Sequence, residues 1–382
     1  MNGMSSTSTS IVRLFAVSTV AALTLGITGC TVGEDEDSSS SSALAVALGD
    51  APNQDVVELY TDRDTAVAAA VEALPELIEK ALEQTGVPGA AVAVVSNGEV
   101  VFEEGYGVRD MTTGEPVDVD TVFQIASLSK PLSSSVVAKA ITEDDELSWE
   151  DPVIEYLPDF ALNDPYVTEH AKIADFFSHR TGIPTGGGDD LEDIGFDVDY
   201  IMAHMDQIPL ASFRDTYQYS NFGLTVGGEA VAASRGQTWA ETAHELLFEP
   251  LGMTSTTTVH DEYLAADDRA AMHARTGDAQ YEQLFDRDAD AEAPAGGVAS
   301  TAGDIAKWGT ATNATMIPDL NVGIVVLTNG APSGVPEAIA SEFVDLVQFG
   351  EETRPWLELW PAQFAHFADP AGDLVGETAP AD

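Results

Sequence analysis

Cysteine occurs once in this chain of 382 residues, at Cys30. A single cysteine excludes a disulfide framework and any metal cluster held by several thiolates. Basic residues are scarce as well: 15 lysines and arginines stand against 65 aspartates and glutamates, which gives a formal net charge of −50. A surface of this charge repels phosphate groups, so we expect no nucleic-acid partner.

The acidic composition does not make this a disordered chain. Apolar residues account for 44% of the sequence, which is enough for a sizeable core. The length predicts one large domain or two ordinary ones. Only five of the basic residues are lysines. Since salt screens the repulsion between acidic side chains, the composition fits a protein that works in concentrated salt.

The N-terminus has the composition of an export signal. Residues 1–29 contain no acid and one base, Arg13, followed by an apolar stretch rich in small residues. The stretch is too short for a membrane span and predicts a secretory signal peptide. Its end, Leu25-Gly-Ile-Thr-Gly-Cys30, resembles a bacterial lipobox. That resemblance implies cleavage before Cys30 and lipid on its sulfur; the alternative is an ordinary signal peptide with an accidental cysteine.

The lipobox interpretation predicts an exported protein, anchored by lipid to the outer face of the cytoplasmic membrane or in the periplasm. Residues 30–60 include a run of serines and the acidic segment Gly33-Glu-Asp-Glu-Asp37. This composition predicts a flexible tether. At the other end, residues 351–382 begin with aromatic residues and become polar, which predicts a C-terminal extension.

Between these ends, apolar periodic segments alternate with turn signals. Asn97-Gly98 favours a tight turn with positive φ, so the apolar runs on both sides predict a β-hairpin. Strands near both ends with helices between them predict a sheet built from distant segments, in an α/β or α+β globule. The other predicted elements are a helix over 62–84, a helix-rich middle over 127–308 with an acidic glycine-rich loop at 186–193, strands over 313–317 and 322–328 with a turn at 318–319, and a helix over 335–347.

The first pattern that carries chemistry is Ser127-Leu-Ser-Lys130. Residues three apart lie on the same side of a helix, so the amine of Lys130 is expected beside the hydroxyl of Ser127. The pattern stands at the predicted start of a helix, where free N–H groups favour developing negative charge. A desolvated lysine has a lowered pKa and can help deprotonate the serine.

A second pattern, Tyr219-Ser-Asn221, follows 92 residues after Ser127. Placed before a helix, it can aim a phenol and an amide into one cleft, where Tyr219 transfers a proton to a leaving group and Asn221 orients a substrate amide. The alternative is a tyrosine that packs in the core and an asparagine that caps the next helix.

With both patterns in place, the chain resembles the serine β-lactamase and penicillin-binding-protein group, especially its class C-like branch, which includes DD-peptidases and esterases. The resemblance covers roughly residues 64–350, so we place the family domain at 61–350. Segments that look like those of the family, in the same order, are Trp149–Val153, Phe177–Pro184, Phe248–Ser255, Pro294–Val298 and Gly323–Asn329.

The resemblance implies a fold in which helices flank an antiparallel sheet beside a helical subdomain. It also implies roles: Ser127 as acyl-forming nucleophile, Lys130 as its activating partner, Tyr219 as proton shuttle and Asn221 as substrate contact. The substrate would be an amide, an ester or a β-lactam, with neither metal nor cofactor. His179 could be taken for the catalytic base of a triad. The family uses no such histidine, so we expect a structural role for His179.

One part of the family pattern is absent. The family carries a third motif, Lys-Thr-Gly or His-Ser-Gly, on an edge strand between the helix that ends near Trp308 and the last two strands. Here Trp308-Gly-Thr310 runs almost directly into Ala311-Thr-Asn-Ala, and neither motif lies between them. Arg275-Thr-Gly277 looks similar but precedes Pro294. Because that strand supplies the second N–H of the oxyanion hole, its loss predicts turnover lower by a factor of about 100 to 1,000.

Other enzyme classes find less support. The sequence contains no Gly-x-Ser-x-Gly and no His-Glu-x-x-His, which argues against an α/β-hydrolase and a zinc hydrolase. Asp286-Arg-Asp-Ala-Asp290 imitates the start of a calcium loop, but Ala291 and Gly297 stand at its sixth and twelfth positions. Two hypotheses remain: a lipid-anchored serine hydrolase weakened by the lost motif, and an inactive relative that binds cell-wall peptides.

Overall fold

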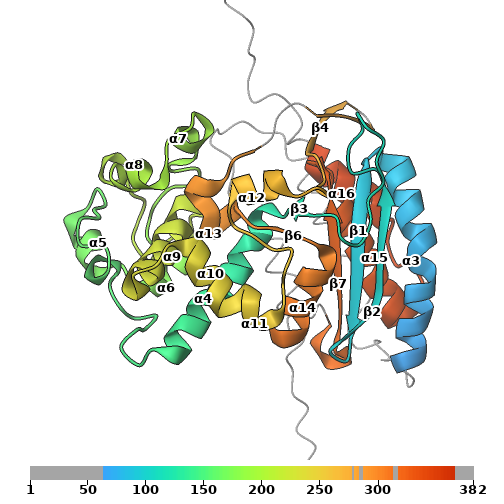
Figure 1. Ribbon diagram of the computed structural model, residues 1–382, viewed down its shortest axis with the longest axis horizontal. Coiled ribbons are helices and arrows are strands. Elements are labelled where there is room, and N and C mark those ends of the chain that lie inside the picture. The colour runs from blue at the N-terminus through green and yellow to red at the C-terminus, as the bar shows by residue number, and fades with distance from the viewer. Residues whose placement is uncertain (1–62, 278, 284–286, 313–316, 366–382) are drawn as a thin grey trace, which may run out of the picture.

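A computed structural model describes residues 63–277, 279–283, 287–312 and 317–365. Its main sheet contains three antiparallel strands in the order β2-β1-β7. Their bounds are β1 Gly89–Ser96, β2 Glu99–Gly107 and β7 Val322–Thr328. Strands β1 and β7, more than 200 residues apart, thus pair in one sheet, as the sequence predicts. The fold class is confirmed: helices flank an antiparallel sheet, with a helical subdomain beside it (Figure 1).

The hairpin between β1 and β2 forms at the predicted turn. Asn97 and Gly98 have φ values of 54° and 79°, the left-handed conformation that a tight primed turn needs. All eight residues of β1 are buried, which is why the strand carries no alternating polar residues before Ser96, its last residue.

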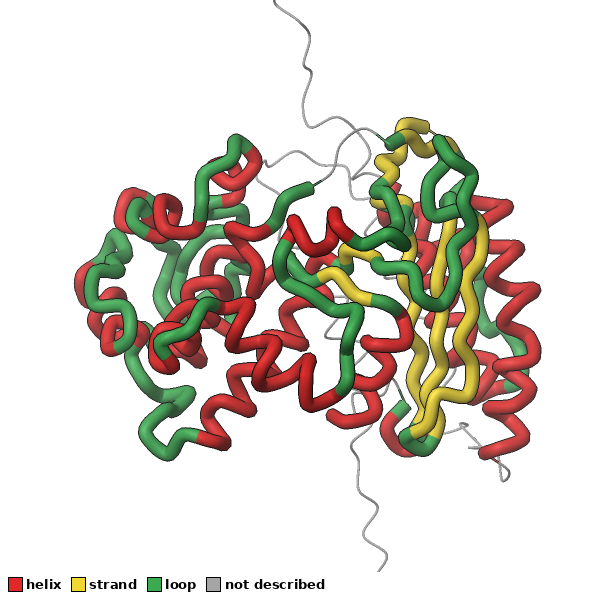
Figure 2. The backbone as a smooth tube through the Cα atoms, viewed as in Figure 1, coloured by secondary structure: helices red, strands yellow, loops and turns green. Residues whose placement is uncertain are grey.

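Helices cover both faces of the sheet. Helices α3 (Arg63–Thr85) and α15 (Val335–Phe349) lie on one face, and α14 (Ala302–Thr312) lies on the other. The side chains of β1 alternate accordingly, since Ala90, Val92 and Val94 belong to the cluster formed with α3 and α15. Ala91, Ala93 and Val95 face the larger core that continues into the helical subdomain. The red and yellow tubes of Figure 2 show these layers side by side.

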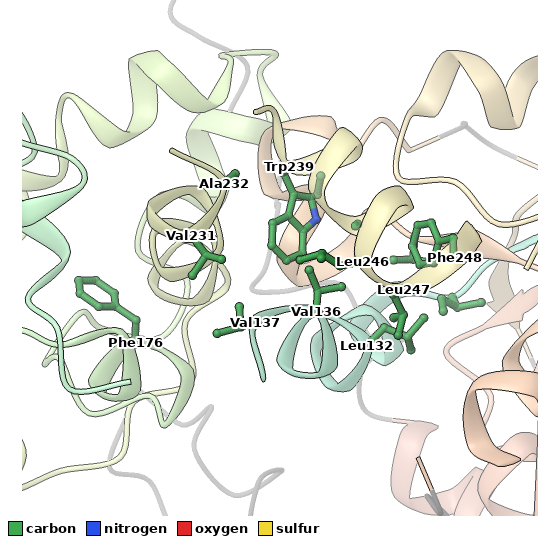
Figure 3. Packing of buried hydrophobic residues seen from close by; sticks show 14 of the residues in the cluster. Leu132, Val136, Val137, Phe176, Val231, Ala232, Trp239, Leu246, Leu247 and Phe248 are labelled. Atoms are coloured by element: carbon green, nitrogen blue, oxygen red, sulfur yellow. The ribbon is translucent and has the colours of Figure 1, made fainter. Parts of the chain in front are cut away.

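The helical subdomain is built around α4 (Ser129–Glu143) and α9 (Asn221–Arg235). Figure 3 shows Leu132, Val136 and Val137 of α4 among apolar side chains of the neighbouring helices. The remaining helices are α5 (Pro165–His170), α6 (Ile173–Phe177), α7 (Asp189–Asp193), α8 (Val198–Met202), α10 (Trp239–Ala243), α11 (Glu249–Leu251), α12 (His260–Ala265), α13 (Ala293–Gly296) and α16 (Trp356–Phe364).

Within the described ranges, five short strands complete the fold. Strands β3 (Phe123–Gln124) and β6 (Ala299–Ser300) form a two-stranded ribbon, and a small sheet has the order β5-β4-β8. The members of that sheet are β4 (His273–Gly277), β5 (Gln280–Glu282) and β8 (Gly330–Ala331).

Three details differ from the sequence-based expectation or limit it. The acidic segment 186–193 is only partly a loop, because α7 begins at Asp189; Gly188 turns the chain at φ 103° and acidic residues favour the first turn of a helix. Of the strand expected at 313–317, residues 313–316 lie outside the described residues, and Ile317 forms a single bridge to Val322. The aromatic start of the C-terminal extension packs on the domain, since Trp356 Nε1 donates to Asp345 at 2.7 Å.

Candidate active site

Ser127 lies at the surface in a turn that its neighbours hold in place. The 3₁₀ turn Ala126–Leu128 follows β3 and leads directly into α4. Ser129 Oγ donates to the Ala126 carbonyl at 2.6 Å and accepts from the Val298 N–H at 3.0 Å. Ala126 has φ 47°, a conformation that costs an alanine about 1–3 kcal/mol, so these bonds maintain a strained turn. The result is an exposed Ser127 beside a rigid framework.

Lys130 follows one helical turn later and is only 8% exposed. Its Nζ lies 3.1 Å from Ser127 Oγ, 2.8 Å from Asn221 Oδ1 and 2.9 Å from the Ala295 carbonyl oxygen. These three acceptors match the three N–H donors of an ammonium group. Burial lowers the pKa of Lys130 to about 8, against the opposing influence of Glu292 and Asp189. The neutral amine, which can accept the proton of Ser127, is therefore accessible near neutral pH.

Tyr219 and Asn221, which stand at the start of α9, reach Ser127 and Lys130 respectively. The Tyr219 hydroxyl lies 2.7 Å from Ser127 Oγ, and Lys130 Nζ lies 4.7 Å from the centre of the Tyr219 ring. Burial raises the pKa of Tyr219. Ser220 caps α9 by accepting from the Gly223 N–H at 2.9 Å. Asn221 is thus not the helix cap, and its side chain is free to contact Lys130.

The structure brings together Ser127, Lys130, Tyr219 and Asn221, which come from two segments 92 residues apart. Cys30, the fifth residue singled out in the sequence, lies outside the described residues. The geometry agrees with the spacing argument, while the chemical role of each residue stays a prediction.

His179 lies behind Tyr219. Its Nδ1 accepts from the Ser220 N–H at 3.2 Å, and its ring centre is 4.9 Å from that of Tyr219. Burial, together with the positive charge of Lys130, lowers the pKa of His179 to about 4. The neutral ring supports the backbone of the Tyr219 segment through the Ser220 N–H, which fits a structural role.

A group of charged side chains beside Lys130 is missing from the sequence-based prediction. Asp189 Oδ2 accepts from Asn221 Nδ2 at 3.2 Å. Arg287 Nη2 lies 2.9 Å from both Glu192 and Glu292. Burial raises the pKa of Glu292 to about 7, with Glu192 adding to the effect and Arg287 opposing it. The acidic segment 186–193 and the rejected calcium pattern were visible in the sequence, but only folding shows that they meet at the lysine.

Among the residues that the structure describes, no group of three His, Cys, Asp or Glu side chains could hold a metal ion. Asp286, the first residue of the rejected calcium pattern, is not among them. Strand β7 is an edge strand of the main sheet. Along its outer edge, the only backbone pairing within the described part of the chain is the bridge between Ile317 and Val322. The absence of the third motif stays a prediction from the sequence.

Comparison with known proteins assigns the chain to a family. The Beta-lactamase family model matches residues 74–314. An unguisins hydrolase of Aspergillus violaceofuscus is 27% identical over 280 residues, covering 68% of this chain and 46% of the relative. Esterase EstB of Burkholderia gladioli is 28% identical over 205 residues, covering 49% of this chain and 51% of the relative. The chain thus spans about half the length of these curated relatives.

A solved structure with a similar fold is the octameric penicillin-binding protein homologue from Pyrococcus abyssi. Its TM-score is 0.62 at 19% identity, and the match covers 74% of this chain and 78% of the other. At that identity the likeness concerns the fold. Because the family model covers well over half of the chain, this protein belongs to the Beta-lactamase family.

Proposed function

We propose that this protein hydrolyses an amide, an ester or a β-lactam through an acyl-enzyme on Ser127. The observation that carries the proposal is the pair of contacts at one exposed hydroxyl: Lys130 Nζ at 3.1 Å and the Tyr219 hydroxyl at 2.7 Å. A nucleophile within hydrogen-bond distance of a base, which is itself oriented by further groups, is the arrangement that covalent catalysis requires. Asn221 and the Ala295 carbonyl provide that orientation for Lys130.

In the proposed first step, neutral Lys130 accepts the proton of Ser127 while Oγ forms a bond to the substrate carbonyl carbon. Tyr219 donates its proton to the leaving nitrogen or oxygen as that atom separates from carbon, and Lys130 can restore the proton to the phenol. In the second step the oxygen of a water molecule bonds to the acyl carbon while Lys130 and Tyr219 take up its proton; the bond between that carbon and Ser127 Oγ then breaks, the acid leaves, and the proton returns to Oγ. Each step conserves protons without a cofactor.

The substrate class rests on the relatives, whose names include a hydrolase and an esterase. We further propose that turnover is weak, because the sequence lacks the third motif of the family. One missing oxyanion donor lowers turnover by a factor of about 100 to 1,000.

Burst kinetics test the acyl-enzyme. We expect a chromogenic ester or β-lactam to release close to one equivalent of product rapidly, followed by a slow steady rate. A fluorescent penicillin or fluorophosphonate should label the intact protein, and mass spectrometry should place the adduct on Ser127. Ser127→Ala should remove burst and label together, while Ser135→Ala, a half-buried serine of the following helix α4, should retain both. A folded wild-type protein that reacts with neither probe would instead support the inactive, peptide-binding alternative.

We also propose export and lipid anchoring at Cys30. None of the helices over the described residues combines the length and hydropathy of a membrane span. In a bacterial host, we expect metabolic labelling with a fatty-acid analogue to mark the protein and detergent to be needed for its extraction. Cys30→Ala should abolish the lipid label. Labelling that persists in this variant, or a wild-type protein that is never labelled, would contradict the anchor.

A further inference from the structure

Helix α7 is attached next to the site at three points. Gly188 packs so closely on Phe222 that an added Cβ would lie 2.7 Å from the ring, and its φ of 103° also favours glycine. The next residue, Asp189, contacts Asn221, the neighbour of Phe222. Glu192 forms the ion pair with Arg287. The glycine therefore allows α7 to approach α9 closely enough for a carboxylate to reach the Asn221 amide.

The amide of Asn221 has one acceptor atom and one donor group, and both are engaged. Oδ1 accepts from Lys130 Nζ at 2.8 Å, and Nδ2 donates to Asp189 Oδ2 at 3.2 Å. Rotating the amide by half a turn would place its NH₂ against an amine that also donates, and its oxygen against a carboxylate that also accepts. The carboxylate thus excludes the rotated arrangement.

We propose that Asp189 is a positioning residue of this site: its carboxylate holds the Asn221 side chain with the oxygen directed at Lys130 Nζ. The proposal rests on the proposed function only in assigning Lys130 as the base. In the arrangement that Asp189 selects, Asn221 orients the amine toward Ser127. Any donor that Asn221 offers to a substrate must then come from the same NH₂ group that Asp189 holds.

Because Asp189 is one of the charged groups around Lys130, replacing it should have a second measurable effect, on the pKa of Lys130. Glu292 and Asp189 raise the pKa of Lys130, Arg287 lowers it, and the other titratable groups facing the amine are Tyr219 and neutral His179. Removing the Asp189 charge should therefore lower the pKa of Lys130, so that the neutral amine forms at lower pH. The acidic limb of the acylation profile should move in the same direction.

The first test is a titration that does not require turnover. The chain contains five lysines, so ¹³C-lysine labelling gives five resonances, and Lys130→Met assigns the one of interest. We expect Asp189→Asn to lower the pKa of Lys130. Asp190→Asn, which removes an exposed charge from the same helix, should leave that pKa in place because water and salt screen it. An unchanged Lys130 titration in Asp189→Asn would overturn the electrostatic part of the proposal.

The second test separates orientation from charge. Asp189→Asn can still accept from Asn221, whereas Asp189→Ala cannot; we expect acylation to fall up to about 100-fold in Asp189→Ala, since misplacement by about 1 Å can cost that much. Asp189→Asn should retain more activity. Asp189→Ala that acylates at the wild-type rate would overturn the positioning role.

A reciprocal exchange tests the contact in the folded protein without a substrate. Asn221→Asp places two carboxylates against each other and should lower the midpoint of thermal unfolding. Adding Asp189→Asn restores a donor facing an acceptor, so the double variant should recover much of the loss. A double variant no more stable than Asn221→Asp would contradict the contact. If the wild-type protein is not acylated at all, the proposed function fails, while the titration and the exchange still decide the role of Asp189.

Discussion

Replacing Lys130 by methionine is expected to slow acylation of Ser127 by a factor of about 10² to 10⁴, the contribution of a positioned general base. Methionine keeps most of the buried volume but supplies no basic nitrogen. Stopped-flow measurement of the burst with an activated ester would give the rate constant. A rate equal to that of the wild type would show that another group accepts the Ser127 proton.

The pH dependence makes this prediction sharper. Burial lowers the pKa of Lys130 to about 8, so wild-type acylation should rise with pH through that region as the amine loses its proton. Lys130→Met should lack this rise. Lys139→Met is the matched control, because Lys139 lies on the same helix but is 46% exposed and paired with Glu143. It should retain the wild-type rate and profile.

Replacing Arg287 by methionine is expected to destabilise the fold at alkaline pH by about 3 kcal/mol. Arg287 pairs with Glu192 and Glu292, whose side chains are each only 3% exposed. Breaking a buried pair costs about 3–5 kcal/mol, and the lower end applies because Arg287 itself is 42% exposed. Chemical denaturation at several pH values, with fluorescence detection, would measure the loss.

The sign of the pH effect follows from the raised pKa of Glu292, about 7 in the fold. An unfolded glutamate titrates near 4.3, so the folded state prefers the protonated form. Glu292 therefore contributes most to the free energy of unfolding below its pKa in the unfolded chain. That contribution is lost as the pH rises through its pKa in the folded protein. Without Arg287, ionisation of Glu292 becomes harder still. The variant should therefore be close to the wild type at pH 5 and much less stable at pH 8.

Arg235→Ala provides the comparison for a surface pair, since its partner Glu245 is 52% exposed. Such pairs contribute about 0–1 kcal/mol, so we expect a small loss with little dependence on pH. Equal losses for Arg287→Met and Arg235→Ala, or a loss for Arg287→Met that is independent of pH, would contradict the buried carboxylate pair.

Local patterns predicted much of the fold because their causes are local. Asn97-Gly98 specifies a turn through its preference for positive φ, and apolar spacing specifies the long helices α3 and α15. The segment 186–193 was predicted less well. Glycine and acidic residues together indicate a loop, but Gly188 turns the chain where it packs on Phe222, and a helix begins at the next residue, Asp189.

The amino-acid sequence by itself determined that Lys130 would lie beside Ser127, because three residues make nearly one helical turn and the contact needs no other part of the chain. Only the tertiary structure decided which groups surround that amine. Tyr219, Asn221, Asp189, Arg287 and Glu292 lie between 59 and 162 positions from Lys130 along the chain, and contact over such separations depends on packing rather than on local spacing. The same packing buries Lys130 and so decides its pKa, which no motif contains.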